Sequence, residues 1–260
     1  MPLIKPFAGL RPAPGQAANV VAPPYDVLNS AEARERAQGK PWSFLHISKA
    51  EIDLPPQVDP YDPAVYAKSA ENMQAMIKAG ILMRDAAPHY YVYRLTMGSH
   101  VQTGLVCVAS VKDYNSNRIR KHEFTRPDKE DDRVRQIEAL NAQTGPVLLA
   151  YKSQPELDAL LQQVARGTPA YDLKADDGIG HAFWVVDDAA MIEQFSRGFD
   201  AMAAIYIADG HHRSAAASRV AAKKGGGEDA MSQYFLSVIF PHNQMKILDY
   251  NRVVTDLQGL

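Results

Sequence analysis

Apolar residues in the first third of the chain recur mainly at helical intervals. Between residues 66 and 77 they fall on one face of a helix, and the Asp62-Pro63 pair in front supplies an N-cap and a proline suited to the first helical position. Asn29 and Glu32 have the spacing of a capping box, which predicts a shorter helix that stops near Gly39. We therefore expect two helices, preceded by an extended, proline-rich segment over residues 1–27.

From residue 90 the spacing of apolar residues changes from the helical one to one typical of β-strands. Tyr90–Met97 and Gln102–Val111, joined by a Gly98-Ser99 turn, predict a long antiparallel hairpin. The same reasoning predicts further strands at Trp42–Ile47 and at Lys246–Tyr250.

In the second half of the chain, strand and helix patterns alternate. Expected strands cover residues 147–151, 181–186, 202–208 and 233–240, and expected helices cover residues 128–140, 155–165, 189–199 and 213–224. This order predicts an α+β fold with helices packed on a mixed, largely antiparallel sheet. We expect a proline-rich, helical lobe at 1–88 and an α/β lobe at 89–260. We expect the second lobe to be truncated at the C-terminus, because the last residues stop within a pattern.

The composition limits the classes of partner. The 260 residues are 46% hydrophobic and 22% charged, with a net charge of −2, as is typical of globular proteins. Without a basic excess, binding to bulk nucleic acid is not expected, and without a long apolar run neither is a membrane partner. Cys107 is the only cysteine and lies in an apolar run, so we expect a buried thiol, no internal disulfide and a cytoplasmic location. Nothing in the sequence indicates an oligomeric state.

The strongest candidate for chemistry is the segment of residues 209–213, between a buried strand pattern and an alanine-rich helix pattern. A helix N-terminus presents unpaired N–H groups and partial positive charge. Gly210 allows close approach to the backbone, Arg213 offers a planar fork of donors, and Asp209 suits an N-cap or a magnesium ligand. His211 and His212 can donate to phosphate or move protons. We predict an anion or phosphate site; the alternative is a capped turn with solvated histidines.

Two further clusters carry polar side chains. Residues 118–122 continue the strand pattern, and His122 and Glu123 at its end offer a general base or a metal ligand, although a charged strand end capped by Thr125 would look the same. Two prolines precede Tyr25 and Asp26 and fix their backbone geometry. Such a rigid loop suits a binding site, but it can also simply attach the N-terminus to the core.

Together the three clusters resemble the family catalogued as domain of unknown function 1015. The residues that carry the resemblance are, in chain order, Pro23-Pro-Tyr-Asp-Val27, His122-Glu123-x-Thr125 and Ala208-Asp-Gly-His-His-Arg213. The likeness covers essentially the whole chain, and six consecutive matched residues in the last motif make it specific. Members of this family are longer than this chain, which agrees with the expected truncation. The family's name implies no established activity.

The last motif is also similar, more distantly, to the phosphate-binding turn of the ParB/sulfiredoxin-like superfamily. That group includes free-serine kinases, sulfiredoxins and nucleotide-hydrolysing ParB partition proteins. The resemblance implies a ParB/sulfiredoxin-like core around the turn, with nucleotide phosphates held there. The turn here has no cysteine, which disfavours sulfinic-acid reduction. No basic helix-turn-helix follows it, which disfavours a partition role.

These observations predict a nucleotide-dependent phosphotransferase that acts on a small hydroxylated metabolite, with serine as one candidate. The expected cofactors are Mg²⁺ and a nucleoside triphosphate or diphosphate. The expected catalytic residues are Glu123 as general base, His122 to orient it, and Asp209 to position magnesium or a histidine. The expected phosphate-binding residues are Gly210, His211, His212 and Arg213, and the expected substrate-binding residues are Tyr25, Asp26 and Thr125.

Two alternatives stay open at this point. The first is a non-catalytic nucleotide or metabolite sensor that uses the same turn without a base. The second is a metal-dependent hydrolase or nuclease, whose ligands would be His122, Glu123, Asp209 and His211.

Overall fold

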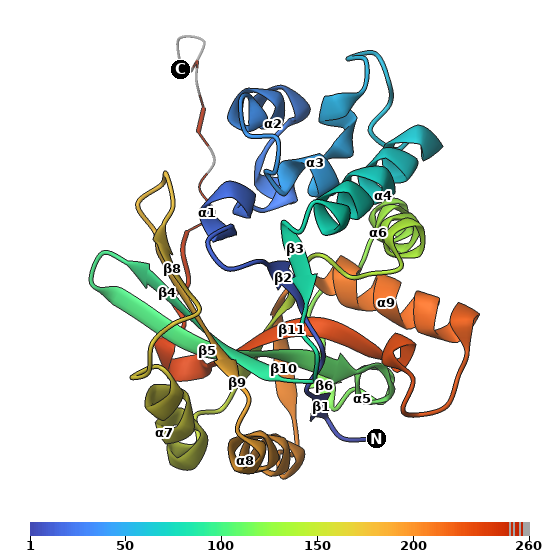
Figure 1. Cartoon of the computed structure of the whole chain (residues 1–260). Helices are drawn as coiled ribbons and strands as arrows, with labels where there is room; N and C mark the ends of the chain where they lie inside the picture. The colour runs from blue at the N-terminus through green and yellow to red at the C-terminus, as the bar shows by residue number, and fades with distance from the viewer. Residues whose placement is uncertain (250, 252, 255, 257–260) are drawn as a thin grey trace.

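The computed structural model describes residues 1–249, 251, 253, 254 and 256, which form a mixed sheet flanked by helices (Figure 1). The strands are β1 Ile4–Lys5, β2 Leu10–Pro12, β3 Leu82–Arg84, β4 Tyr90–Met97, β5 His100–Ser110, β6 Ile119–Arg120, β7 Val147–Tyr151, β8 Tyr171–Lys174, β9 Gly180–Val186, β10 Ile205–Asp209 and β11 Tyr234–Pro241. Within the described residues the main sheet has nine strands, in the order β6-β10-β7-β11-β5-β4-β9-β8, with β1 paired to β5. The β10–β6 and β11–β7 pairs are parallel and the others antiparallel. β2 and β3 form a separate antiparallel pair.

Helices cover both faces of the main sheet. The α-helices are α1 Ala17–Val20, α2 Ser30–Ala37, α3 Leu45–Ser48, α4 Pro63–Lys78, α5 Val111–Asn115, α6 Pro127–Leu140, α7 Pro155–Val164, α8 Ala189–Asp200 and α9 His211–Lys224. The 3₁₀ turns are η1 Tyr25–Val27, η2 Ala50–Asp53, η3 Met231–Gln233 and η4 His242–Gln244. In Figure 1, α7 and α8 lie on one side of the sheet, α2, α3 and α4 on the other, and α9 runs beside α6. The predicted α+β class with a mixed, largely antiparallel sheet is confirmed.

The local signals at the helix starts act as expected. The Asp62 carboxylate accepts the backbone N–H of Ala64, with Pro63 in the first turn of α4. Asn29 and Glu32 form a reciprocal capping box at the start of α2. Cys107 is a buried free thiol, and burial raises its pKa. In the described part of the chain, no helix combines the length and apolar character that crossing a membrane requires.

Two predicted strands are wrong. Residues 42–47 lead into the short helix α3, where the Ile47 carbonyl accepts from the hydroxyl of Ser69 (2.6 Å) and the amide of Gln136 (3.1 Å). Those side chains of α4 and α6 satisfy the backbone, so no strand partner is needed. Residues 246–249 form no strand, and the side chain of Ile247 is 96% exposed rather than packed on the sheet. Tyr250, the last residue of that prediction, lies outside the described residues.

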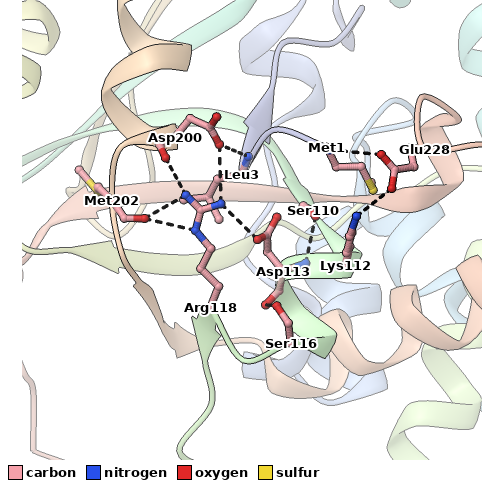
Figure 2. A network of polar contacts seen from close by, with 10 residues as sticks. All are labelled: Met1, Leu3, Ser110, Lys112, Asp113, Ser116, Arg118, Asp200, Met202 and Glu228. Atoms are coloured by element: carbon pink, nitrogen blue, oxygen red, sulfur yellow. Dashed lines mark hydrogen bonds and ion pairs between the residues drawn. The ribbon is translucent and has the colours of Figure 1, made fainter.

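Arg118, just before β6, connects the C-terminal end of α8 with α5 (Figure 2). Its guanidinium donates to the carbonyls of Asp200 (2.7 Å) and Met202 (2.9 Å) and to Asp113 Oδ1 (3.2 Å). The carboxylate of Asp200 in turn accepts the backbone N–H of Leu3 (3.0 Å). This network fixes the N-terminus, α8 and β6 relative to one another, immediately before β10 leads into the predicted site.

We expect Arg118→Met to lower the free energy of unfolding by about 2 kcal/mol, because it removes charge-assisted hydrogen bonds from a partly buried group. Urea unfolding measures this loss. Arg197→Met is the control, since its ion pair with Glu193 is exposed on both sides and is worth at most about 1 kcal/mol. Equal losses in the two variants would contradict the role given to Arg118.

Candidate functional site

The turn at residues 209–213 links β10 to α9. Gly210 is the N-cap of α9 and adopts a left-handed conformation with a φ of 92°. No side chain caps the helix, and its first turn contains no acidic residue. The helix instead begins with His211, His212 and Arg213, which add donor groups to the positive end of the dipole. The first turn of α9 therefore holds no carboxylate of its own, and an anionic ligand could place negative charge there.

A second helix N-terminus lies beside the first, because α6 and α9 run in the same direction. Their parallel course is given by the ion pairs Arg219–Asp131 (2.6 Å) and Lys223–Glu138 (2.5 Å). At the N-terminal ends, the backbone N–H of Arg126 donates to Nε2 of His212 (3.1 Å). Arg126 is the N-cap of α6, and its side chain makes no capping hydrogen bond, but Asp128 and Glu130 lie in the first turn of this helix. The two helix N-termini therefore lie at the same place, and α6 brings its own carboxylates there while α9 has none in its first turn.

His211 is the buried centre of this arrangement, with only 3% of the residue exposed. Its Nε2 accepts the backbone N–H of His122 (3.4 Å), which leaves the ring hydrogen on Nδ1. Nδ1 is buried and forms no hydrogen bond, although Glu123 Oε2 lies 3.3 Å away. Burial, followed by the neighbouring His122, lowers the pKa of His211, and this outweighs the opposing charges of Glu123 and Asp209. His211 is therefore neutral at pH 7.

The loop before α6 brings the second sequence cluster to this histidine. The rings of His122 and His211 meet edge to face, with centroids 4.5 Å apart. The side chain of Glu123 stays 56% exposed, so it can reach a ligand as well as His211. Thr125 donates its hydroxyl to Glu130 and so ties the loop to α6. That hydroxyl is engaged within the protein, and its predicted contact with substrate stays a prediction.

Asp209 and Arg213 are paired with each other across the turn. Nη2 of Arg213 donates to Asp209 Oδ2 (2.6 Å), and Nη1 donates to the carbonyl of Pro146. The alternative in which Asp209 caps the helix is wrong, because Gly210 is the N-cap and the Asp209 carboxylate turns to the arginine. The guanidinium folds over Gly210, where a Cβ atom would lie 3.0 Å from both Nε and Cζ.

The third cluster reaches the same region through Tyr25. The guanidinium of Arg133, on α6, lies over the Tyr25 ring at 4.1 Å from its centroid. Burial raises the pKa of Tyr25, and the charges of Arg133 and Arg213 oppose that rise. Tyr25 therefore packs against α6, the helix whose N-terminus lies at the turn. Asp26 is exposed and acts on Tyr25 electrostatically, so its own role as a substrate ligand stays a prediction.

Sequence reasoning assigned no role to two arginines that help to build the site, although the charged run after the second cluster contains both. Arg126 directly follows the second cluster, and its position beside Thr125 could have marked it. Arg133 lies well inside α6, and no local pattern distinguishes it from the other charged residues of that helix.

A hydrolase centre with four protein ligands is not supported by the side-chain arrangement. Over residues 1–249 and the few described beyond them, no group of three or more His, Cys, Asp or Glu side chains could hold a metal ion. His122 and Glu123 do meet His211, but the nearest partner of Asp209 is the Arg213 guanidinium.

The neutral state of His211 predicts a pH dependence of stability. Its folded pKa lies below the unfolded value of about 6.5, so the unfolded chain binds more protons once the pH falls below 6.5. Stability is therefore expected to decrease from pH 7.5 to 5.5, with His181 adding to the decrease because burial lowers its pKa too. Urea unfolding of His211→Gln should give a smaller decrease than the wild type, whereas a His100→Gln control should not. An unchanged pH dependence in His211→Gln would contradict this account.

These features define an α+β protein with two parallel helix N-termini, basic side chains and a buried neutral histidine at one place. The chain belongs to the family described as "Protein of unknown function (DUF1015)", whose model matches residues 4–260. The family assignment made from the three motifs is thereby confirmed. No curated protein and no solved structure matches the chain.

Proposed function

We propose that the protein is a nucleotide-dependent phosphotransferase that phosphorylates the hydroxyl group of a small metabolite, with serine as one candidate acceptor. The observation that carries the proposal is the meeting of the N-termini of α6 and α9 with His211, His212 and Arg213 and with the exposed carboxylate of Glu123. Phosphoryl transfer needs mainly positioning and charge neutralisation, which such a set can supply. The similarity of the turn to ParB/sulfiredoxin-like phosphate sites supports the same assignment.

In this proposal each cluster has one task. The N–H groups of residues 210–213 and the Arg213 guanidinium hold the nucleotide phosphates. Glu123 takes the proton of the acceptor hydroxyl while the hydroxyl oxygen of the acceptor bonds to the terminal phosphorus. The bond from that phosphorus to the rest of the nucleotide breaks, and the nucleotide leaves with the electron pair. His122 orients the base, and Tyr25, Asp26 and Thr125 line the acceptor side.

The donor set near the turn fits a magnesium ion held together with a nucleotide. Mg²⁺ is usually bound by one or two carboxylates and by substrate phosphates, rather than by an all-protein cage. The Asp209 side chain is 65% exposed and uses one oxygen, Oδ2, for Arg213, so Oδ1 is available for such an ion. When bound, the ion would neutralise phosphate charge. We place the reaction in the cytoplasm, where a single reduced cysteine is expected.

The test is calorimetry of the full chain with ATP and ADP in the presence of magnesium, followed by ³¹P detection of a phosphorylated acceptor. We expect binding by the wild type that Arg213→Ala weakens at least about tenfold and that the exposed-surface control Arg166→Ala leaves unchanged. Absence of nucleotide binding would overturn the proposal. Binding without transfer to any hydroxyl acceptor would replace it with the sensor alternative.

A further inference from the structure

A second cavity, of about 840 Å³, lies at the end of the main sheet where β7 leaves it and β10 enters it. Helices α7 and α8 form its wall, and residues 201–204, which connect α8 to β10, form its rim. None of the residues assigned to the phosphotransfer site lines this α7–α8 cavity. Its volume falls within the range of about 300–1,000 Å³ that is usual for small-molecule sites.

The wall and the rim of the cavity are held in place by contacts within the protein. Helices α7 and α8 pack closely at Gly198, where a Cβ atom would lie 2.6 Å from Cδ2 of Leu157. The guanidinium of Arg118 fixes the start of the rim by donating to the carbonyls of Asp200 (2.7 Å) and Met202 (2.9 Å) (Figure 2). The cavity therefore exists before any ligand arrives, which lowers the cost of binding.

One part of the lining is apolar. Leu157 and Leu160 contribute from α7, and Met202 contributes from the rim. Tyr206 also lines the cavity and is 49% exposed, although its strand lies inside the sheet, between β6 and β7. A ligand with an apolar body would cover this surface, and removing apolar surface from water is favourable.

The other part of the lining carries an excess of positive charge. Three cations, Arg120, Lys152 and Arg197, line the cavity. Among the described residues, Glu156 supplies the one carboxylate of the lining. Arg197 pairs with Glu193 (3.1 Å), but over the described part of the chain the side chains of Arg120 and Lys152 form no hydrogen bond or ion pair. Unpaired charges of one sign in a hollow with apolar walls attract a ligand of the opposite charge.

We propose that the α7–α8 cavity binds a small organic acid. The apolar body of the acid lies against Tyr206 and the leucines of α7, and its carboxylate or other acidic group accepts hydrogen bonds from Arg120 and Lys152. These two cations come from opposite sides of β10, because Arg120 lies on β6 and Lys152 directly follows β7. They can therefore bind one acidic group from two directions. This binding site does not depend on the proposed phosphotransfer.

The test is calorimetry of the full chain with three organic acids, 2-naphthoate, indole-3-acetate and decanoate, and with their uncharged amides. We expect saturable binding of at least one acid and at least about tenfold weaker binding of its amide, which cannot form the charge-assisted hydrogen bonds. Lys152→Gln should weaken binding of that acid by about 3- to 30-fold and leave its amide unchanged. The control Lys78→Gln changes an exposed lysine of α4 and should alter neither affinity.

A second variant fills the cavity. Ala203 lines the cavity and is exposed, so Ala203→Trp can place an indole there and should weaken binding of the acid at least about tenfold. Ala75→Trp, at an exposed position of α4, is the matched control and should leave the affinity unchanged.

The inference is overturned if none of the three acids binds the wild type, or if acid and amide bind equally well. It is also overturned if folded Ala203→Trp, checked by circular dichroism, binds the acid as the wild type does. Should Ala203→Trp not fold, an unchanged affinity of Lys152→Gln for the acid would overturn it. Nucleotide is absent from every arm, so failure of the proposed phosphotransfer leaves these results readable.

Discussion

Replacing Glu123 with glutamine is expected to lower the rate of phosphoryl transfer by about 10²- to 10⁴-fold, the usual contribution of a general base. Glutamine keeps the size and the hydrogen-bonding oxygen of the side chain but cannot take the acceptor's proton. Because the proposal gives Glu123 a contact with the acceptor hydroxyl and none with the nucleotide, the Kd for nucleotide should stay within about twofold. The measurement is steady-state transfer together with calorimetric nucleotide affinity.

The matched control is Glu71→Gln, which changes an exposed glutamate of α4 that pairs with Lys68. It should alter neither the rate nor the affinity. If the rate of Glu123→Gln equalled that of the wild type, Glu123 would not be the base. If the nucleotide affinity of Glu123→Gln fell in step with its rate, Glu123 would be a nucleotide-binding residue and could not be assigned as the general base.

Local signals in the sequence predicted most of the fold because their physics is local. The proline and aspartate at the start of α4 act within one turn of each other, and β4 and β5 are neighbours in the chain that pair along the whole hairpin. The strand predicted at residues 42–47 was wrong because non-local contacts decide their structure. Their apolar side chains pack on α4, and side chains from α4 and α6 bind the Ile47 carbonyl. β8 was missed for a related reason: it is an edge strand with alternate exposed residues and little apolar signal.

The candidate site was predictable as a set of motifs but not as an arrangement. Glycine, arginine and two histidines before an alanine-rich helix indicated an anion site from chemistry alone. The contact between His122 and His211 joins residues 89 positions apart, and no spacing rule reports it. The parallel course of α6 and α9 depends on ion pairs that exist only in the folded chain. The second helix N-terminus therefore emerged only from the structure.

Gly210→Ala is expected to weaken nucleotide and pyrophosphate binding by about 10- to 100-fold and to lower the free energy of unfolding by about 1–2 kcal/mol. The left-handed backbone at this position accounts for the loss of stability, because alanine adopts it only with strain. The loss of affinity has a different cause. A Cβ atom would lie 3.0 Å from Nε and Cζ of Arg213, so the guanidinium must shift by a few tenths of an ångström from the position in which it binds Asp209 and Pro146.

Gly80→Ala separates these two causes, since Gly80 also has a positive φ, of 69°, but a Cβ there meets nothing within 4 Å. Both variants should lose similar stability in urea, while only Gly210→Ala should lose anion affinity. Equal affinities in the two variants would mean that the position of Arg213 over the turn is not required for binding. The difference between them therefore measures what the close approach of Arg213 to Gly210 contributes, independently of the backbone strain that both glycines relieve.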